Sequence, residues 1–216
     1  MCAHYTIFIE QDELRDIVAA AEKNLKEATP NFKMATSDIW PKYFAPVLMP
    51  EKGEMKPAAM RWGFPLKMKK KRQKDPAHPE YTTKYVQNAK LETAQASRFW
   101  NDSLAERRCL IPVSGFFEWK TLQDKTKVPY YFYLPTSNLM YVAGMYKFFK
   151  TEDGEYLPHY TMMTTQPTHE VGLVHDRMPV VLTKAEEQVW LSGDFMALVN
   201  RSNIHLQGAE TTKEKM

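Results

Sequence analysis

The fold is decided by residues 108–119, which read Arg-Cys-Leu-Ile-Pro-Val-Ser-Gly-Phe-Phe-Glu-Trp. The largely apolar run Arg108–Val113 predicts a buried strand. Glu118 follows between two aromatic residues. If this second run is also a strand, alternation can turn Glu118 outward while its neighbours point inward. The alternative is a desolvated carboxyl with a raised pKa, which would suit proton transfer at neutral pH.

Three later segments have the composition of strands. Aromatic and branched residues fill Tyr130–Leu134, Leu139–Phe149 and Tyr156–Thr165, and turn sequences separate them. We therefore expect a β-meander. Residues 183–190 begin with Thr-Lys-Ala-Glu, the pattern of a capping box, and predict a helix.

The N-terminal side mixes strand, helix and irregular chain. His4–Glu10 alternates loosely and predicts a first strand, whereas Asp12–Leu25 has apolar residues at a helical period. Residues 30–60 are rich in proline and aromatic residues, which indicates irregular connections between short strands. Because there is no internal repeat and no linker, we expect one domain over residues 1–206 and a polar, disordered tail over residues 207–216.

The composition is that of an ordinary globular protein. The chain has 216 residues, of which 44% are hydrophobic and 25% are charged. No apolar run approaches the roughly 20 residues of a membrane span, and acidic residues interrupt the place of a signal peptide, so we expect a cytoplasmic protein. Its two cysteines lack CxxC spacing and its six histidines form no HExxH motif. We therefore expect no metal and no other cofactor.

The first two residues, Met1-Cys2, carry a possible chemistry of their own. Removal of Met1 would leave Cys2 with a free α-amine and a thiol on adjacent carbons. The ordinary pKa values, about 8 and about 8.5, give both groups a reactive fraction at neutral pH. A 1,2-aminothiol captures aldehydes as an imine and then as a five-membered thiazolidine. Taken alone, however, a cysteine in second position is more often without any such role.

Other candidate residues have two interpretations each. Arg61 and Trp62 precede six basic residues between Lys67 and Lys74, and together they suggest a stacking platform with a phosphate-facing loop. The alternative is a core tryptophan, a surface ion pair and a solvated loop. A lone asparagine such as Asn88 most often caps or turns the chain. A lone histidine such as His175 most often makes a structural hydrogen bond.

Six short motifs follow one another along the chain: Cys2, Arg-Trp-Gly (61–63), Asn-Ala-Lys-Leu-Glu-Thr (88–93), Arg-Cys-Leu-Ile-Pro (108–112), Gly-Phe-Phe-Glu-Trp (115–119) and His-Asp-Arg-Met-Pro (175–179). Together and in this order they resemble the SRAP domain, the SOS response-associated peptidase family, whose members shield abasic sites in single-stranded DNA. The resemblance covers residues 2 to about 190. It implies an α+β fold in a single compact domain, built around a strongly bent, mostly antiparallel β-sheet or barrel with flanking helices.

The resemblance also implies roles for individual residues. Cys2 would capture the open-chain aldehyde of an abasic site and link the protein covalently to DNA. Asn88 would hold the α-amine or the sugar oxygen, Glu118 would shuttle protons, and His175 would favour opening of the sugar ring. The protein would act as a monomer, associated with the nucleoid when bound. The residues implied to contact DNA are Arg61, Trp62, Lys90, Arg177 and Pro41.

Two substitutions depart from the family pattern. His4 stands where an arginine is usual, and Lys90 replaces another arginine. Because a neutral imidazole does not bind phosphate as a guanidinium does, DNA contacts near the N-terminus are in question.

Two rival functions remain open. The first is a cysteine peptidase of the N-terminal-nucleophile type, which would include removal of its own Met1. The second is a module that binds single-stranded nucleic acid without using Cys2. Cys109 lies in an apolar strand, where an inert buried thiol is the expectation.

Overall fold

The computed structural model describes residues 2–10, 12–28, 32–70 and 80–212. Its centre is a closed barrel of five strands, in which each strand pairs with two neighbours. All neighbours are antiparallel except β12 and β4, which pair in parallel. Closure leaves the barrel without an exposed edge. The barrel strands are β3 (Phe44–Glu51), β4 (Glu54–Trp62), β8 (Arg108–Val113), β11 (Met140–Lys150) and β12 (Tyr156–Thr165).

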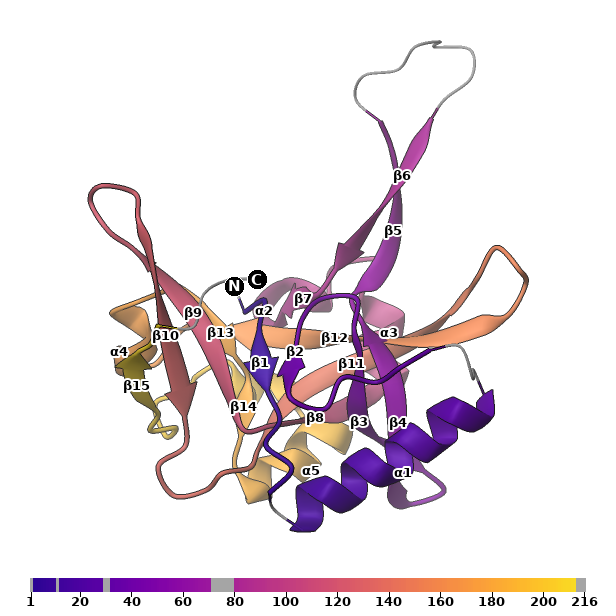
Figure 1. The fold of residues 1–216 in the computed structure, drawn as a ribbon, viewed down its shortest axis with the longest axis horizontal. Helices are drawn as coiled ribbons and strands as arrows, with labels where there is room; N and C mark the ends of the chain where they lie inside the picture. Colours follow the sequence, from indigo (N-terminus) through magenta and orange to yellow (C-terminus); the bar gives the residue numbers. More distant parts are fainter. Residues whose placement is uncertain (1, 11, 29–31, 71–79, 213–216) are drawn as a thin grey trace.

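A second, five-stranded sheet stands beside the barrel (Figure 1). Its strand β1 (Tyr5–Thr6) is only two residues long, where the alternation predicts a strand to Glu10, and it lies between β9 and β2 and pairs with both. The sheet therefore holds the start of the chain between strands that come from distant parts of the sequence. In spatial order its strands are β15 (Gln207–Glu210), β10 (Lys127–Tyr133), β9 (Gly115–Thr121), β1 (Tyr5–Thr6) and β2 (Asp38–Ile39).

Short elements extend and cover these sheets. Helix α1 (Asp12–Ala28) buries its apolar stripe against β3 and β4. Helix α5 (Lys184–Ser192) begins with the predicted capping box at Thr183. Within the described ranges, no helix is both long enough and apolar enough to cross a membrane. The remaining elements are α2 (Leu91–Ala94), α3 (Asn101–Glu106), α4 (His169–Gly172), the 3₁₀ helix η1 (Phe195–Leu198), β7 (Asn88–Lys90), β13 (Met178–Pro179) and β14 (Val181–Leu182).

A two-stranded hairpin of β5 (Phe64–Lys69) and β6 (Tyr81–Val86) projects from this body (Figure 1). It carries the start of the predicted basic run. Lys70 follows β5, and the last three basic residues of the run fall in residues 71–79, which lie outside the described residues.

The expected α+β fold with a bent, mostly antiparallel sheet and flanking helices is confirmed. The expected meander is confirmed only for β11 and β12, which form a hairpin. Strand β10 instead pairs with β9 and β15, because a tight turn closed by Leu122 N–H to Thr126 O returns the chain onto β9.

The prediction of disorder from Gln207 is wrong for residues 207–210, which form β15. The polar composition of these residues suggested disorder, but their backbone pairs with β10. In addition, the Tyr133 hydroxyl donates to Gln207 Oε1 at 2.9 Å. Composition alone does not show this pairing. Residues 213–216 lie outside the described part of the chain.

Candidate active site

Cys2 lies in the interior, with 0% of its surface exposed. Phe117 N–H donates to His4 O at 2.9 Å, so the residues that precede β1 also lie beside β9. This brings Cys2 close to Glu118. The Cys2 thiol donates to His4 O at 3.5 Å. Burial first, and then the charge of Glu118, raise the pKa of the Cys2 thiol far above its usual range. The sulfur is therefore a neutral thiol at pH 7.

Asn88 fixes the backbone of Cys2. It lies on β7, which pairs in parallel with β12, and its side chain is buried. Asn88 Nδ2 donates to Cys2 O at 2.6 Å. Its Oδ1 is also buried, and no donor reaches it from the described residues. An amide oxygen accepts up to two hydrogen bonds, so Asn88 keeps a free acceptor beside Cys2.

Glu118 is a buried carboxyl whose ionisation is shifted into the neutral range. It is 1% exposed, and burial raises its pKa to about 7. Of the two interpretations of this residue, the structure therefore supports the desolvated carboxyl. Near pH 7 such a group is about half protonated, so it can both donate and accept a proton.

His175 faces Glu118 with one ring nitrogen, because its Nε2 lies 3.8 Å from Glu118 Oε2. The other ring nitrogen, Nδ1, accepts from the backbone N–H of Arg177 at 3.1 Å and lies 3.0 Å from Asp176 Oδ1. Burial lowers the pKa of His175, although the exposed Asp176 carboxylate opposes that shift. The imidazole thus turns its Nε2 toward the Glu118 side of the site.

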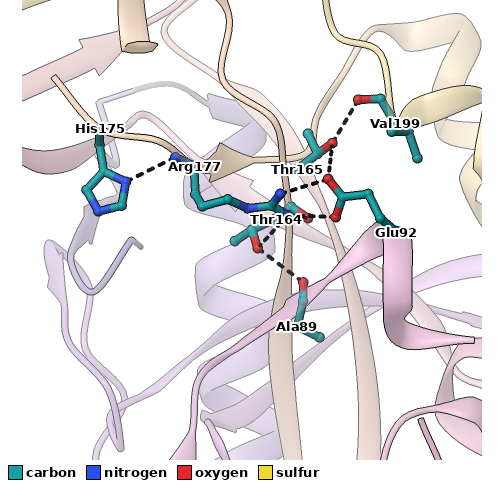
Figure 2. A network of polar contacts seen from close by, with 7 residues as sticks. All are labelled: Ala89, Glu92, Thr164, Thr165, His175, Arg177 and Val199. Carbon is teal, nitrogen blue, oxygen red and sulfur yellow. Dashed lines mark hydrogen bonds and ion pairs between the residues drawn. The ribbon is translucent and has the colours of Figure 1, made fainter. Parts of the chain in front are cut away.

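Arg177 is a structural residue (Figure 2). Its guanidinium donates to both carboxylate oxygens of Glu92 at 2.8 Å and to Thr164 O at 2.7 Å, and the residue is 7% exposed. These bonds engage the guanidinium within the protein, and the DNA contact of Arg177 stays a prediction. The arginine instead joins the 175–179 segment to α2 and β12.

Trp62 is also in the core. It is 0% exposed and its Nε1 donates to Gln87 O at 2.9 Å, so no base can stack on it. The core interpretation of Trp62 holds, and the stacking prediction is wrong here. The other predicted DNA contacts remain at the surface: Lys90 is exposed, and Arg61 and Pro41 are half-buried.

His4 takes a position that the sequence does not reveal. Its ring stacks between Trp40, at 3.9 Å between centroids, and Phe117, at 4.2 Å. His4 Nε2 lies 2.6 Å from Asp38 Oδ1. The residue that replaces the usual arginine is thus a buried support for the Cys2 segment. Only the pairing of β1 with β2 and β9 brings these residues together.

The second thiol has no part in this cluster. Cys109 is 0% exposed on β8, and burial raises its pKa. Within the described part of the chain, no three His, Cys, Asp or Glu side chains come together as metal ligands.

Comparison with known proteins identifies the family of this chain. The SOS response associated peptidase (SRAP) family profile matches residues 1–212. The abasic site processing protein YoqW of Bacillus subtilis (strain 168) is 30% identical over 193 residues, covering 89% of this chain and 80% of the relative. The abasic site processing protein HMCES of Xenopus tropicalis is 27% identical over 226 residues, covering 88% and 66%.

The fold has also been seen in a crystal structure of a protein from Bacteroides thetaiotaomicron. That structure aligns with a TM-score of 0.70 and 16% identity, over 97% of this chain and 91% of the other. At this identity the likeness concerns the fold alone. With the family profile matched over nearly all of its length, the chain belongs to the SOS response associated peptidase (SRAP) family.

Proposed function

We propose that this protein processes abasic sites in single-stranded DNA by forming a covalent thiazolidine link through Cys2 after Met1 is removed. Its relatives are named abasic site processing proteins, which supports an abasic site as the lesion that it processes. The observation that carries the chemistry is the convergence of three distant segments on Cys2. Asn88 holds its carbonyl, and Glu118 and His175 form an acid–base pair beside it.

The first step is capture of the aldehyde by the amine. The α-amine of Cys2 adds to the open-chain sugar, and water leaves as the imine forms. Asn88 Oδ1, the acceptor left free, is placed to take a hydrogen bond from that amine. Glu118 in its protonated form would donate to the leaving hydroxyl. His175 Nε2–H would polarise the ring oxygen of the closed sugar and favour its opening.

The second step is closure of the ring. The Cys2 sulfur adds to the imine carbon, and its proton passes to Glu118, which the first step left ionised. The net reaction joins an aldehyde and an aminothiol with loss of one water, and it needs no oxidant or reductant. A protonated imine is a strong electrophile, so a neutral thiol that loses its proton during attack is sufficient.

The same thiol suits amide hydrolysis less well. An amide is a weak electrophile and calls for a thiolate, whereas burial raises the pKa of Cys2. We therefore place the peptidase activity, including self-removal of Met1, second to aldehyde capture.

Replacement of each cysteine in turn tests the proposal. Cys2→Ser should give no stable adduct with a single-stranded oligonucleotide that contains one abasic site, as judged on a denaturing gel. Cys109→Ala, which removes the other buried thiol, should leave the adduct yield unchanged. An undiminished yield with Cys2→Ser would refute the assignment.

A further inference from the structure

The turn between β2 and β3 holds one lysine in an uncommon backbone conformation. Lys42 has φ of 77°, in the left-handed region that non-glycine residues seldom adopt. Its backbone is bonded on both sides to β4: Lys42 N–H donates to Trp62 O at 2.8 Å, and Arg61 Nε donates to Lys42 O at 3.0 Å. The surroundings therefore fix the direction in which this exposed side chain leaves the surface.

Two cations converge on one aromatic ring. Lys42 Nζ lies 5.4 Å and the Arg61 guanidinium 5.0 Å from the centroid of Tyr85. Among the described residues, neither cation forms an ion pair with a carboxylate. Like charges held close together repel, so an anion beside them would be stabilised by both. Because Nε is already used, the two terminal nitrogens of Arg61 remain as a fork for such an anion.

The same pattern continues along one face of the hairpin. Pairing sets Pro65 opposite Tyr85 and Lys69 opposite Tyr81, and residues two apart on a strand share a face. Lys67 is therefore on this face too, and its Nζ lies 5.1 Å from the centroid of Tyr81. Lys67, Lys69 and Tyr81 are all exposed. We call this set of residues the cation–tyrosine strip: Lys42, Arg61, Lys67, Lys69, Tyr81 and Tyr85.

The strip begins close to the candidate active site. Trp40, whose ring stacks on His4, is two residues from Lys42, and two residues of chain span at most about 7 Å. His4 O in turn accepts from the Cys2 thiol. In Figure 1 the connection between β2 and β3 arches from the β1 region toward the base of the β5–β6 hairpin. The strip thus leads away from Cys2 along the projecting hairpin.

We propose that the cation–tyrosine strip binds the DNA strand flanking the lesion, with phosphates on its cations and bases on its tyrosines. Alternating cations and aromatic rings are what single-stranded nucleic acid requires, because every nucleotide offers an anion and a flat face. A hollow of about 360 Å³ beside Lys42 and Arg61 is lined by the exposed rings of Phe32 and Tyr43, which gives an unstacked base a further apolar surface. This proposal deepens the proposed function and rests on it for the identity of the strand.

Non-covalent binding tests the strip without involving the chemistry of Cys2. The affinity for an undamaged, fluorescently labelled single-stranded oligonucleotide is measured by anisotropy at several salt concentrations. Lys42→Asn with Arg61→Gln removes the paired cations, and asparagine tolerates the left-handed backbone. Lys23→Gln with Lys26→Gln removes the same charge from the exposed face of α1, across the body from the hairpin, and is the matched control.

The strip variant should weaken binding by roughly tenfold at low salt, and the slope of log affinity against log salt should fall by about 1.4, or about 0.7 for each lost contact. The α1 control should stay within about twofold of the wild type. Tyr81→Leu with Tyr85→Leu should weaken binding by roughly 30-fold or more, whereas Tyr81→Phe with Tyr85→Phe should not, since phenylalanine keeps the ring. Circular dichroism of each variant establishes that it is folded.

Equal losses in the strip and α1 variants would show that only net charge matters and would overturn the proposal, as would no loss in either. If the wild type forms an adduct with abasic DNA but the strip variants bind with wild-type affinity, the strip is not a DNA-binding surface and the proposed function still holds. Strip-dependent binding without any adduct refutes the covalent function and leaves the strip standing as a binding surface.

Discussion

Two glutamates receive partners from the same short segment, and their pKa values are shifted in opposite directions. His175 faces Glu118, and Arg177, two residues later, binds Glu92. At Glu118 burial dominates and raises the pKa to about 7. At Glu92 burial is also the largest single influence and acts to raise the pKa, but the hydrogen bonds and charge of Arg177, together with a backbone hydrogen bond and one from Thr165, outweigh it and the pKa is lowered.

The opposite pKa shifts give the two carboxyl groups different roles: Glu118 can exchange protons, whereas Glu92 stabilises the fold. A neutral imidazole 3.8 Å away does not stabilise the Glu118 carboxylate as a cation would. The carboxyl therefore keeps its raised pKa and can exchange its proton at neutral pH. A bidentate guanidinium keeps Glu92 charged and fixed in place. One segment therefore supplies an acid–base partner to Glu118 and a structural anchor to Glu92.

The largest effect is expected from Glu118→Gln. Glutamine keeps the shape of the side chain but cannot transfer the proton, so the rate of adduct formation at pH 7 should fall roughly 10²–10⁴-fold. Quenched time courses on denaturing gels measure that rate. Glu92→Gln is the matched variant at the other carboxylate and should stay within about threefold of the wild type. A Glu118→Gln rate within threefold would remove this residue from the mechanism.

A smaller effect, on stability, is expected from Arg177→Met. It leaves the Glu92 carboxylate without its guanidinium, and the free energy of unfolding should fall by about 3 kcal/mol, at the lower end of the range because Glu92 is partly exposed. Urea unfolding measures the change, and Arg177→Met with Glu92→Met should recover most of it. If Arg177→Met instead has wild-type stability and its slope of log affinity for DNA against log salt falls by about 0.7, Arg177 contacts a phosphate.

The last effect is a difference between the two glutamates in the pH dependence of stability. The folded pKa of Glu118 is raised, so the unfolded chain loses its proton first, and stability falls between about pH 4.5 and about pH 7, by roughly 3 kcal/mol in all. The folded pKa of Glu92 is lowered, so its contribution is complete above the unfolded pKa and is lost as the pH falls through the folded one.

Unfolding curves in urea at a series of pH values measure both contributions. Glu118→Gln should remove the decline between about pH 4.5 and about pH 7, and Glu92→Gln should flatten only the acid side. Parallel wild-type and Glu118→Gln curves across that window would mean that Glu118 is ionised normally.

Local patterns predicted those elements whose partners lie close in sequence. The apolar run of β8, the β11–β12 hairpin and the capping box of α5 are fixed by alternation, turns and a side chain three residues away. Pairing over long distances stayed hidden. Neither the sandwich of His4 between Trp40 and Phe117 nor strand β15 has a local signature, since each depends on which strands meet.

The site was predicted in part for the same reason. The motif order identified Asn88, Glu118 and His175, and in the structure Asn88 and Glu118 lie beside Cys2 while His175 faces Glu118. The same motifs assigned Trp62 and Arg177 to DNA binding, because a sequence motif does not show whether a side chain is buried. Both side chains are inside. Lys42 and Tyr85 were missed, since their relation to Arg61 arises only where a turn, a barrel strand and the hairpin meet.

Intact mass measurement after incubation with an abasic oligonucleotide tests the central claim most directly. Protein that begins at Cys2 should gain the mass of the oligonucleotide less one water, whereas protein prepared with Met1 retained should gain no stable mass, because the nitrogen of Cys2 is then an amide. An adduct of equal yield on the Met1-retained protein would contradict the account.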